Sequence, residues 1–201
     1  MGSRPRQARA SGNDNVDSLV KEILRTQRLV LRETENADFD DLFSMLSDPI
    51  VMVHYPKTYS VEETQRWIDW TRQRYAELGY CLWAVTLAAN GEFLGQCGLL
   101  VHDIDGVREI EVAYLFKRSA WHRGYATEAA RACRDYAFRE LGCDHVISLI
   151  RPANLPSRAV AERNGMTVWK TTTFRDLEAV VYRVERSAQA ANVQTAPTTR
   201  E

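Results

Sequence analysis

The chain has 201 residues, of which 45% are hydrophobic and 26% are charged, and its formal net charge at pH 7 is −1. These values are ordinary for a globular protein with one core, and they exclude an overall basic field that would attract nucleic acid or anionic lipid. No run approaches the roughly 20 apolar residues that span a bilayer, and no apolar signal segment follows Arg4, Arg6 and Arg9. We therefore expect a cytoplasmic protein that binds neither nucleic acid nor a membrane.

The two ends of the chain are predicted to be tails around one domain at residues 26–187. Residues 188–201 are polar and predicted to be disordered. Residues 1–25 are predicted to form a flexible tail, in which apolar residues at the spacing of one helix face indicate a short helix. These residues are Val16, Leu19, Val20 and Ile23.

The first part of the domain predicts a strand and two helices. Residues 28–33 have the composition of a strand, and residues 37–46 place apolar side chains on one helix face. A second helix begins at Ser60 with Glu63 three residues later, which is the spacing of a capping box. It is expected to end near Gly79.

Three strands are predicted next, at residues 82–88, 93–101 and 109–116. Asn90-Gly91 and Asp105-Gly106 separate them, and such dipeptides accept the positive φ angles of tight hairpin turns. We therefore expect three antiparallel neighbours.

The rest of the domain predicts a long helix, a strand, a short helix and a final pair of strands. Their ranges are 125–141, 146–150, 157–164, 167–173 and 178–184. This order favours an α/β (α+β mixed) fold, in which a mixed sheet carries helices on both faces.

A polar loop from Lys117 to Ala126 joins a strand directly to the long helix. The first N–H groups of a helix are unpaired and lie at the positive end of its dipole, so they bind phosphate. Gly124 and Ala126 allow a close approach of the backbone to such an anion, and Arg118 and Arg123 add positive charge. Taken alone, the pattern fits equally well a loop whose glycine eases the entry into the helix.

A second junction between strand and helix carries Asn154 and Ser157. Ser157 is a candidate helix cap, and Asn154 lies at the mouth between the two elements. Taken alone, these are two capping residues before a helix that stops at Asn164-Gly165.

Together the two junctions resemble the GNAT superfamily of acetyltransferases and, within it, the RimJ/RimL-like branch. The pyrophosphate motif of the superfamily, Gln/Arg-x-x-Gly-x-Gly/Ala, appears with a Trp in first place, which is familiar in this branch: Trp121-His122-Arg123-Gly124-Tyr125-Ala126. The downstream pattern differs only in a Met for the final Phe: Asn154, Ser157, Glu162, Gly165 and Met166. The resemblance covers about residues 26–186.

The resemblance implies the GNAT fold, a mostly antiparallel mixed sheet in which two parallel strands splay apart around the pantetheine arm of acetyl-CoA. These strands would be Val112–Phe116 and Val146–Ile150. It implies a cofactor site in which pantetheine meets the backbone of Tyr114, Leu115 and Phe116 and also Asn154. The amides of His122, Arg123, Gly124, Tyr125, Ala126 and Thr127 would hold the pyrophosphate. No metal is expected, and the four histidines (His54, His102, His122 and His145) are scattered along the chain.

The activity implied is acetyl transfer to a primary amine. Because amines are mostly protonated at pH 7, a general base is expected to help. Glu111 is the candidate, because the branch carries a Glu on this strand. Glu109 points to the same face and stays an alternative. The other interpretation is that both are solvent-facing carboxylates.

The departing thiolate needs an acid or water. The Tyr that many members of the superfamily use for this purpose is replaced here by Ala161. Ser157 is the remaining candidate, as proposed for RimL-like proteins, unless it is only a helix cap.

The acceptor stays open at this point. It is a protein N-terminal amine or a small molecule such as an antibiotic or polyamine, and the latter predicts an acidic pocket. Acidic residues in nearby helices are Asp38, Asp40, Asp41 and Asp69. Further alternatives are a catalytically idle module that binds acetyl-CoA, and a site that holds a different acyl-CoA or nucleotide. The oligomeric state is also open, with a homodimer as one alternative. Trp67, Trp70 and Trp83 are expected mainly in the core.

Overall fold

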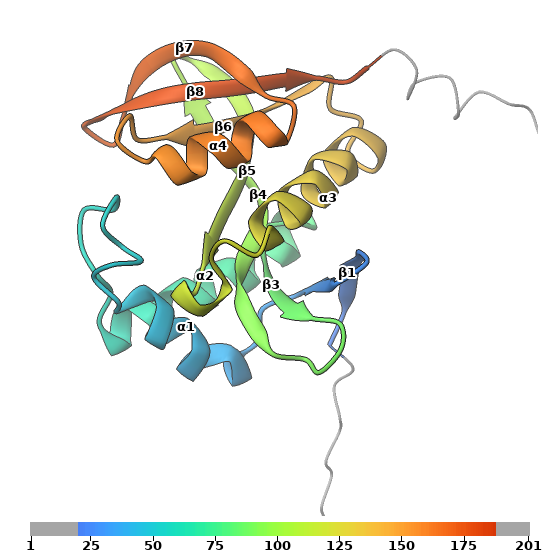
Figure 1. Ribbon diagram of the computed structural model, residues 1–201, viewed down its shortest axis with the longest axis vertical. Helices are drawn as coiled ribbons and strands as arrows, with labels where there is room; N and C mark the ends of the chain where they lie inside the picture. Colours follow the sequence, from blue (N-terminus) through green and yellow to red (C-terminus); the bar gives the residue numbers. More distant parts are fainter. Residues whose placement is uncertain (1–19, 188–201) are drawn as a thin grey trace, which may run out of the picture.

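The computed structural model of the chain describes residues 20–187 (Figure 1). Both predicted tails lie largely outside these residues. The strands are β1 (Glu22–Arg25), β2 (Leu29–Arg32), β3 (Leu82–Leu87), β4 (Phe93–Ile104), β5 (Val107–Phe116), β6 (His145–Ile150), β7 (Thr167–Phe174) and β8 (Leu177–Glu185). The helices are α1 (Phe39–Leu46), α2 (Val61–Leu78), α3 (Tyr125–Arg139) and α4 (Leu155–Arg163), with short 3-10 turns at Asn36–Asp38 and Arg118–Ala120.

All eight strands belong to one sheet, in the order β1-β2-β3-β4-β5-β6-β8-β7. Every neighbouring pair is antiparallel except β5 and β6, which run parallel. The prediction of a mostly antiparallel mixed sheet with one parallel pair is therefore confirmed. The two turn dipeptides lie at the ends of β3 and β4, where the sequence places them.

The helix boundaries follow the capping chemistry. Ser60 caps α2: its hydroxyl accepts a hydrogen bond from the N–H of Glu63 (3.3 Å), and Glu63 Oε2 accepts one from the N–H of Ser60 (2.9 Å). Gly79 ends the helix with φ 81°, a left-handed conformation that glycine adopts without strain. Both predicted ends of this helix are confirmed.

Two local predictions were wrong. Residues 22–25 form strand β1, paired with β2, instead of the predicted helix, because an edge of the sheet is available to them. Ile23 is therefore a strand residue, while Val16 and Leu19 lie outside the described residues. Helix α4 begins at Leu155, and Asn154, not Ser157, is its cap.

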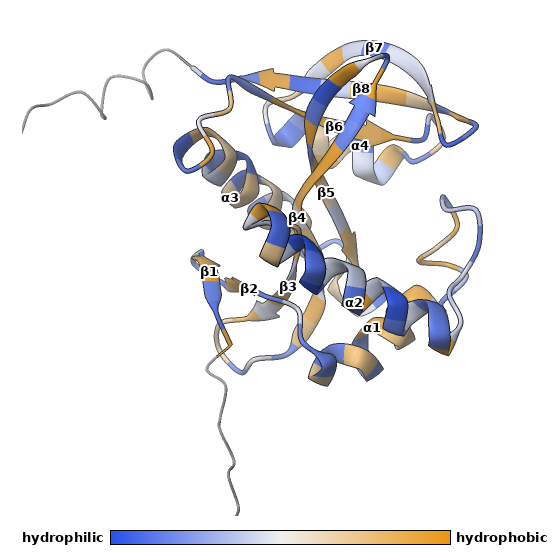
Figure 2. Ribbon diagram, turned by 180° about the vertical axis from the view of Figure 1, so that it is seen from behind, coloured by the Kyte–Doolittle hydropathy of each residue, from blue (hydrophilic) through white to orange (hydrophobic). Residues whose placement is uncertain are grey.

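Helices cover both faces of the sheet, as predicted. α3 packs on one face, where Leu29, Leu99 and Val112 belong to the main core, and α1 and α2 enclose a second apolar cluster on the other. Figure 1 shows β6, β7, β8 and α4 in the upper part of the molecule and β1, β2, β3, α1 and α2 in the lower part, with β5 and α3 between them. Seen from behind, much of the ribbon of α2 has the colour of hydrophilic residues (Figure 2). Among residues 20–187 no helix has the length and apolar character needed to cross a membrane.

Candidate active site

The parallel strands β5 and β6 separate along their length. Each strand is paired on its outer side, β5 with β4 and β6 with β8. Between them the register contains one pair, Glu111 with Ile147. Beyond it, the Ser148 hydroxyl donates to the Val112 carbonyl (2.7 Å). Within residues 20–187, the edge of β5 from Ala113 onward therefore has no strand partner on the β6 side.

A cleft with a volume of about 810 Å³ opens at this separation. Its walls come from β4, β5, β6, α2, the loop after α1 and the turn between β7 and β8. Five residues that the sequence singled out line it together: Glu111, Tyr114, Leu115, Asn154 and Ser157. Phe116 does not, because its side chain is only 5% exposed and packs in the core.

The carboxylate of Glu111 is held from two sides. The residue is 8% exposed. Its Oε1 accepts a hydrogen bond from the N–H of Leu149 (3.0 Å), and its Oε2 lies 2.7 Å from Nε2 of His102. The ring of His102 packs edge-on against Phe174, with centroids 4.8 Å apart. A fixed carboxylate with an imidazole partner facing a cleft is suited to taking up a proton.

His102, which was not identified from the sequence as a site residue, lines the same cleft. Its position follows from the hairpin turn at Asp105-Gly106, which pairs His102 with Glu109 and puts it diagonally across from Glu111. The position of the hairpin turn in the sequence could therefore have identified His102, although the four histidines look scattered when each is considered alone.

Glu109 occupies a different place from Glu111. It is 2% exposed, its Oε2 lies 2.6 Å from Nε2 of His145, and it does not line the cleft. The interpretation of the two glutamates as solvent-facing carboxylates is wrong, since both are buried against a histidine. The geometry also separates them, because Glu111 alone reaches the cleft.

Tyr114 connects the two sides of the opening. Its hydroxyl donates to the carbonyl of Ser157 in α4 (2.8 Å). Burial, helped by negative neighbours that include Glu111, raises the pKa of Tyr114 well above its ordinary value, so the phenol stays protonated. Asn154 Oδ1 accepts from the N–H of Ser157 (3.2 Å) as the cap of α4. No group within residues 20–187 bonds the Ser157 hydroxyl, which leaves it available inside the cleft.

The loop before α3 contains two residues in the left-handed conformation. His122 and Gly124 both have positive φ angles, 59° and 79°, and Gly124 is the residue preceding the helix. The N–H groups of the first helical turn, from Tyr125 to Thr127, have no carbonyl of their own helix to bind. Trp121 closes the loop, since its Nε1 donates to the carbonyl of Phe116 (2.9 Å).

Glu128 fastens this loop to the start of β2. Its carboxylate accepts hydrogen bonds from the Thr26 hydroxyl (2.6 Å) and the Arg28 N–H (3.0 Å), and it forms an ion pair with the Arg28 guanidinium (2.6 Å). The same guanidinium donates to the carbonyl of Arg123 (3.0 Å) and lies 4.6 Å from the centre of the Tyr125 ring. Burial works to raise the pKa of Glu128, but the hydrogen bonds from Thr26 and Arg28 outweigh it, and the pKa is lowered.

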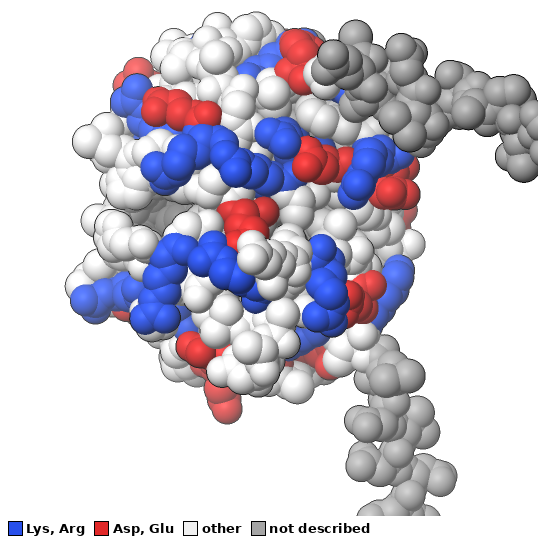
Figure 3. Space-filling view, turned by 45° about the vertical axis from the view of Figure 1, so that its right-hand side comes forward, with Lys and Arg blue, Asp and Glu red and all other residues white. Residues whose placement is uncertain are grey.

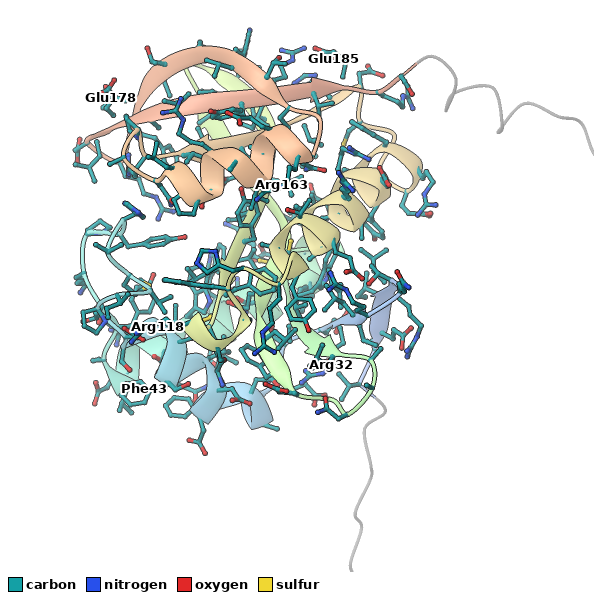
Figure 4. The ribbon with its side chains drawn as sticks, viewed as in Figure 1. Arg32, Phe43, Arg118, Arg163, Glu178 and Glu185 are labelled. Carbon is teal, nitrogen blue, oxygen red and sulfur yellow. The ribbon has the colours of Figure 1, made fainter. Side chains whose placement is uncertain are left out.

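Positive side chains flank the start of α3. A second hollow, with a volume of about 580 Å³, contains Lys117, Arg118 and His122. From the other side, Arg163 at the end of α4 donates through Nε to the Thr127 hydroxyl (3.3 Å). Figure 4 shows Arg118 and Arg163 on opposite sides of the helix start, and Figure 3 shows Lys and Arg side chains in bands above and below a hollow. Arg163 was not identified from the sequence.

The tryptophans divide between core and cleft. Trp83 is fully buried, as expected. Trp67 and Trp70 stack at 5.0 Å and both line the cleft.

The chain is similar to known acetyltransferases along most of its length. Residues 28–167 match the model of a family described as the acetyltransferase (GNAT) domain. The uncharacterized protein YkkB of Bacillus subtilis is 40% identical over 164 residues, which cover 81% of this chain and 95% of the relative. The crystal structure of an acetyltransferase from Agrobacterium tumefaciens is 32% identical, has a TM-score of 0.72, and covers 81% of this chain and 94% of its own.

A more distant neighbour is RimL, a ribosomal L7/L12 alpha-N-protein acetyltransferase solved with coenzyme A. Its TM-score is 0.66 at 17% identity, and the match covers 82% of this chain and 98% of RimL. That likeness shows the fold alone.

Proposed function

Because the chain belongs to the GNAT acetyltransferase family, whose members use acetyl-CoA, we propose that it transfers the acetyl group to a primary amine that Glu111 deprotonates. One observation supports this assignment above all. The Glu111–His102 pair, the free Ser157 hydroxyl and the unpaired edge of β5 face the same cleft. A base, a candidate acid and a strand edge for an extended ligand are what the reaction requires.

The donor is proposed to lie along β5 and to end at α3. The amides of its pantetheine arm would pair with the backbone from Tyr114 to Phe116, and Asn154 would contact the same arm. The pyrophosphate would sit on the N–H groups of residues 122–127, where a helix start favours negative charge. Arg118 and Arg163 stand on either side of this position and would add charge-assisted contacts.

The chemical step needs a neutral amine next to the thioester. The amine nitrogen attacks the thioester carbonyl, a C–N bond forms, and the C–S bond breaks to release coenzyme A. Glu111 takes the proton that the nitrogen loses, and His102 stabilises the resulting change of charge from 2.7 Å away. Ser157 is proposed to protonate the departing thiolate. A weak acid is sufficient there, because an ordinary thiol has a pKa of about 8.5.

Within the family, the motif beginning at Trp121 favours the RimJ/RimL-like branch, which makes a protein N-terminal amine one candidate acceptor. Small-molecule amines are the other. An idle acetyl-CoA-binding module is less well supported, because it would have no need of a buried carboxylate held by two partners at the cleft.

The test is the release of coenzyme A by purified protein given acetyl-CoA and a panel of N-terminal peptides and small amines. Glu111→Gln is expected to lower kcat by about 100-fold, the usual contribution of a general base. Glu109→Gln is the matched control, because it changes an equally buried glutamate on the same strand that lies outside the cleft. It should stay within about threefold of the wild type.

Two results would count against the proposal. If no acceptor releases coenzyme A while acetyl-CoA still raises Tm, the chain is a binding module. If both variants lose activity equally, Glu111 has no special role.

A further inference from the structure

The end of the cleft beyond Glu111 is rich in arginine. Arg108 lies on β5, Arg151 at the end of β6 and Arg175 in the turn between β7 and β8, and all three line the cleft. Tyr55, from the loop after α1, lies within the electrostatic range of Glu111, Arg151 and Arg175. Tyr55, Glu111, Arg151 and Arg175 therefore lie near one another, although they come from four separate segments.

None of the three guanidinium groups has a carboxylate partner within residues 20–187. Arg151 donates only to main-chain carbonyls of the turn, those of Phe174 (3.2 Å), Leu177 (2.9 Å) and Glu178 (3.0 Å). The guanidinium of Arg175 lies 5.2 Å from the centre of the Phe174 ring. Burial and the like charge of Arg175 lower the pKa of Arg151, which is the mark of cations gathered without counterions.

The balance of charge decides which amines fit. Among the described residues that line the cleft, Glu111 is the one carboxylate, and it is occupied by His102 and Leu149. Asp103, the cross-strand partner of Arg108, and Asp176, which follows Arg175 in sequence, do not line it. The acidic pocket predicted for a polyamine or aminoglycoside is therefore absent from the described residues of the cleft. Such an acceptor would instead bring several positive charges to these arginines.

Other walls of the cleft are aromatic. Tyr55, Tyr59, Trp67, Trp70 and Phe174 all line the cleft. Tyr59 and Trp67 meet edge-on at 6.0 Å, and Trp67 stacks on Trp70 at 5.0 Å. Aromatic walls contribute large apolar contact with specific geometry, and they suit a flat or apolar body.

We propose that the acceptor is a small amino carboxylate: an amine that carries a carboxylate on an apolar or aromatic body. This rests on the proposed acetyl transfer. The amine meets Glu111, the body lies against the tryptophans and tyrosines, and the carboxylate pairs with Arg175. The planar guanidinium of an arginine donates two parallel hydrogen bonds to a carboxylate. An amine that lacks a carboxylate cannot accept them, so the site would select against such amines.

The test compares amines that differ only in the carboxylate. One pair is phenylalanine and phenethylamine, and a second, with a longer spacing, is 4-(aminomethyl)benzoate and 4-methylbenzylamine. We expect kcat/KM to favour at least one carboxylate member by about tenfold or more, as for a charge-assisted contact. Phenylalaninamide and acidic peptides are included, and a preference for either of them over the free amino carboxylates overturns the proposal.

Substitution of Arg175 tests whether this arginine causes the preference for acceptors that carry a carboxylate. Arg175→Gln should raise KM for the carboxylate by about tenfold and leave KM for its partner amine within about twofold. Arg74→Gln is the matched control, since Arg74 also lines the cleft but already pairs with Glu77 (3.1 Å). Equal effects on both members of a pair would contradict the proposal.

A binding measurement separates this inference from the proposed transfer. With coenzyme A present, N-acetylphenylalanine and N-acetylphenethylamine are compared by the shift in Tm. If no amine is acetylated, the proposed transfer fails, yet a larger shift with the carboxylate still supports the arginine-lined site. If neither ligand shifts Tm, or the neutral one shifts it more, the amino-carboxylate inference is overturned.

Discussion

The start of α3 and the cleft around Glu111 are the two ends of the proposed binding site, and they differ in the kind of atoms that they present. At the start of α3, the main chain is exposed: a turn at Gly124 and the unpaired N–H groups of the first helical turn. At the other end, side chains converge from distant segments, among them Tyr55, His102, Arg108 and Arg175. Main-chain sites tolerate many sequences as long as the turn can form, whereas a site of side chains changes with each substitution. The first end therefore suits the donor common to the family, and the second suits an acceptor particular to this chain.

The largest effect that would sharpen this comparison is expected at His102, a side chain of the second end. His102→Gln removes the imidazole that lies 2.7 Å from Glu111 and should lower kcat by about 30-fold, less than the roughly 100-fold that loss of the base itself would cost. His145→Gln is the control, because His145 pairs with Glu109 away from the cleft. Steady-state kinetics with a saturating donor measures both. Equal losses would mean that the two pairs only stabilise the sheet.

The same contrast explains what the sequence could predict. The antiparallel order of β3, β4 and β5, both ends of α2 and the start of α3 after Gly124 were predicted because hairpin dipeptides, caps and the Gly124 turn act locally. The helix predicted around Ile23 failed because an edge of the sheet, a long-range feature, captures residues 22–25. His102 and Arg163 were missed for a related reason: their roles depend on strand register and on the packing of α4 against α3.

The next effect concerns the main-chain end. Gly124→Ala forces a side chain into a left-handed conformation (φ 79°), and we expect the Kd for coenzyme A to rise by about tenfold, since such strain costs about 1–2 kcal/mol. Gly91→Ala has the same kind of strain (φ 75°) in a distant hairpin turn and should leave this Kd unchanged. Isothermal titration calorimetry compares them. If the two variants bind coenzyme A equally well, the turn at Gly124 is not part of the donor site.

A smaller effect, on stability, is expected at the support of that turn. Glu128→Gln weakens the hydrogen bonds to Thr26 and Arg28 and should lower the free energy of unfolding at pH 7 by about 1–2 kcal/mol. Because the folded state lowers the pKa of Glu128, its contribution is present above the unfolded value of about 4.3 and is lost as the pH falls through the folded value. The difference from the wild type should therefore shrink in acid.

Urea unfolding at pH 7 and near pH 3 measures this difference. Glu77→Gln is the control, because Glu77 forms an exposed ion pair with Arg74 and should change the free energy by less than about 0.5 kcal/mol. A gap between wild type and Glu128→Gln that persists unchanged in acid would assign the loss to packing instead of charge.

The smallest expected effect is on the ionisation of Tyr55, one of the side chains that line the cleft. Burial of the hydroxyl, with help from the negative charge of Glu111, raises the pKa of Tyr55 to about 12, although the residue as a whole is 46% exposed. The neutral phenol is favoured in the folded state, so this contribution to stability is complete below the ordinary pKa of 10.0 and disappears as the pH rises through about 12. Absorbance at 295 nm, with Tyr55→Phe as the reference, isolates this titration.

Variants of its neighbours then test the shared space. Glu111→Gln should lower the pKa of Tyr55, because a negative neighbour is lost, and Arg175→Gln should raise it, because a positive neighbour is lost. Shifts of opposite sign require that Tyr55 feels both charges across one cavity. If neither variant moves the titration, the tyrosine does not face the cleft, and the acceptor would meet Glu111 without the aromatic and arginine walls on which its selection depends.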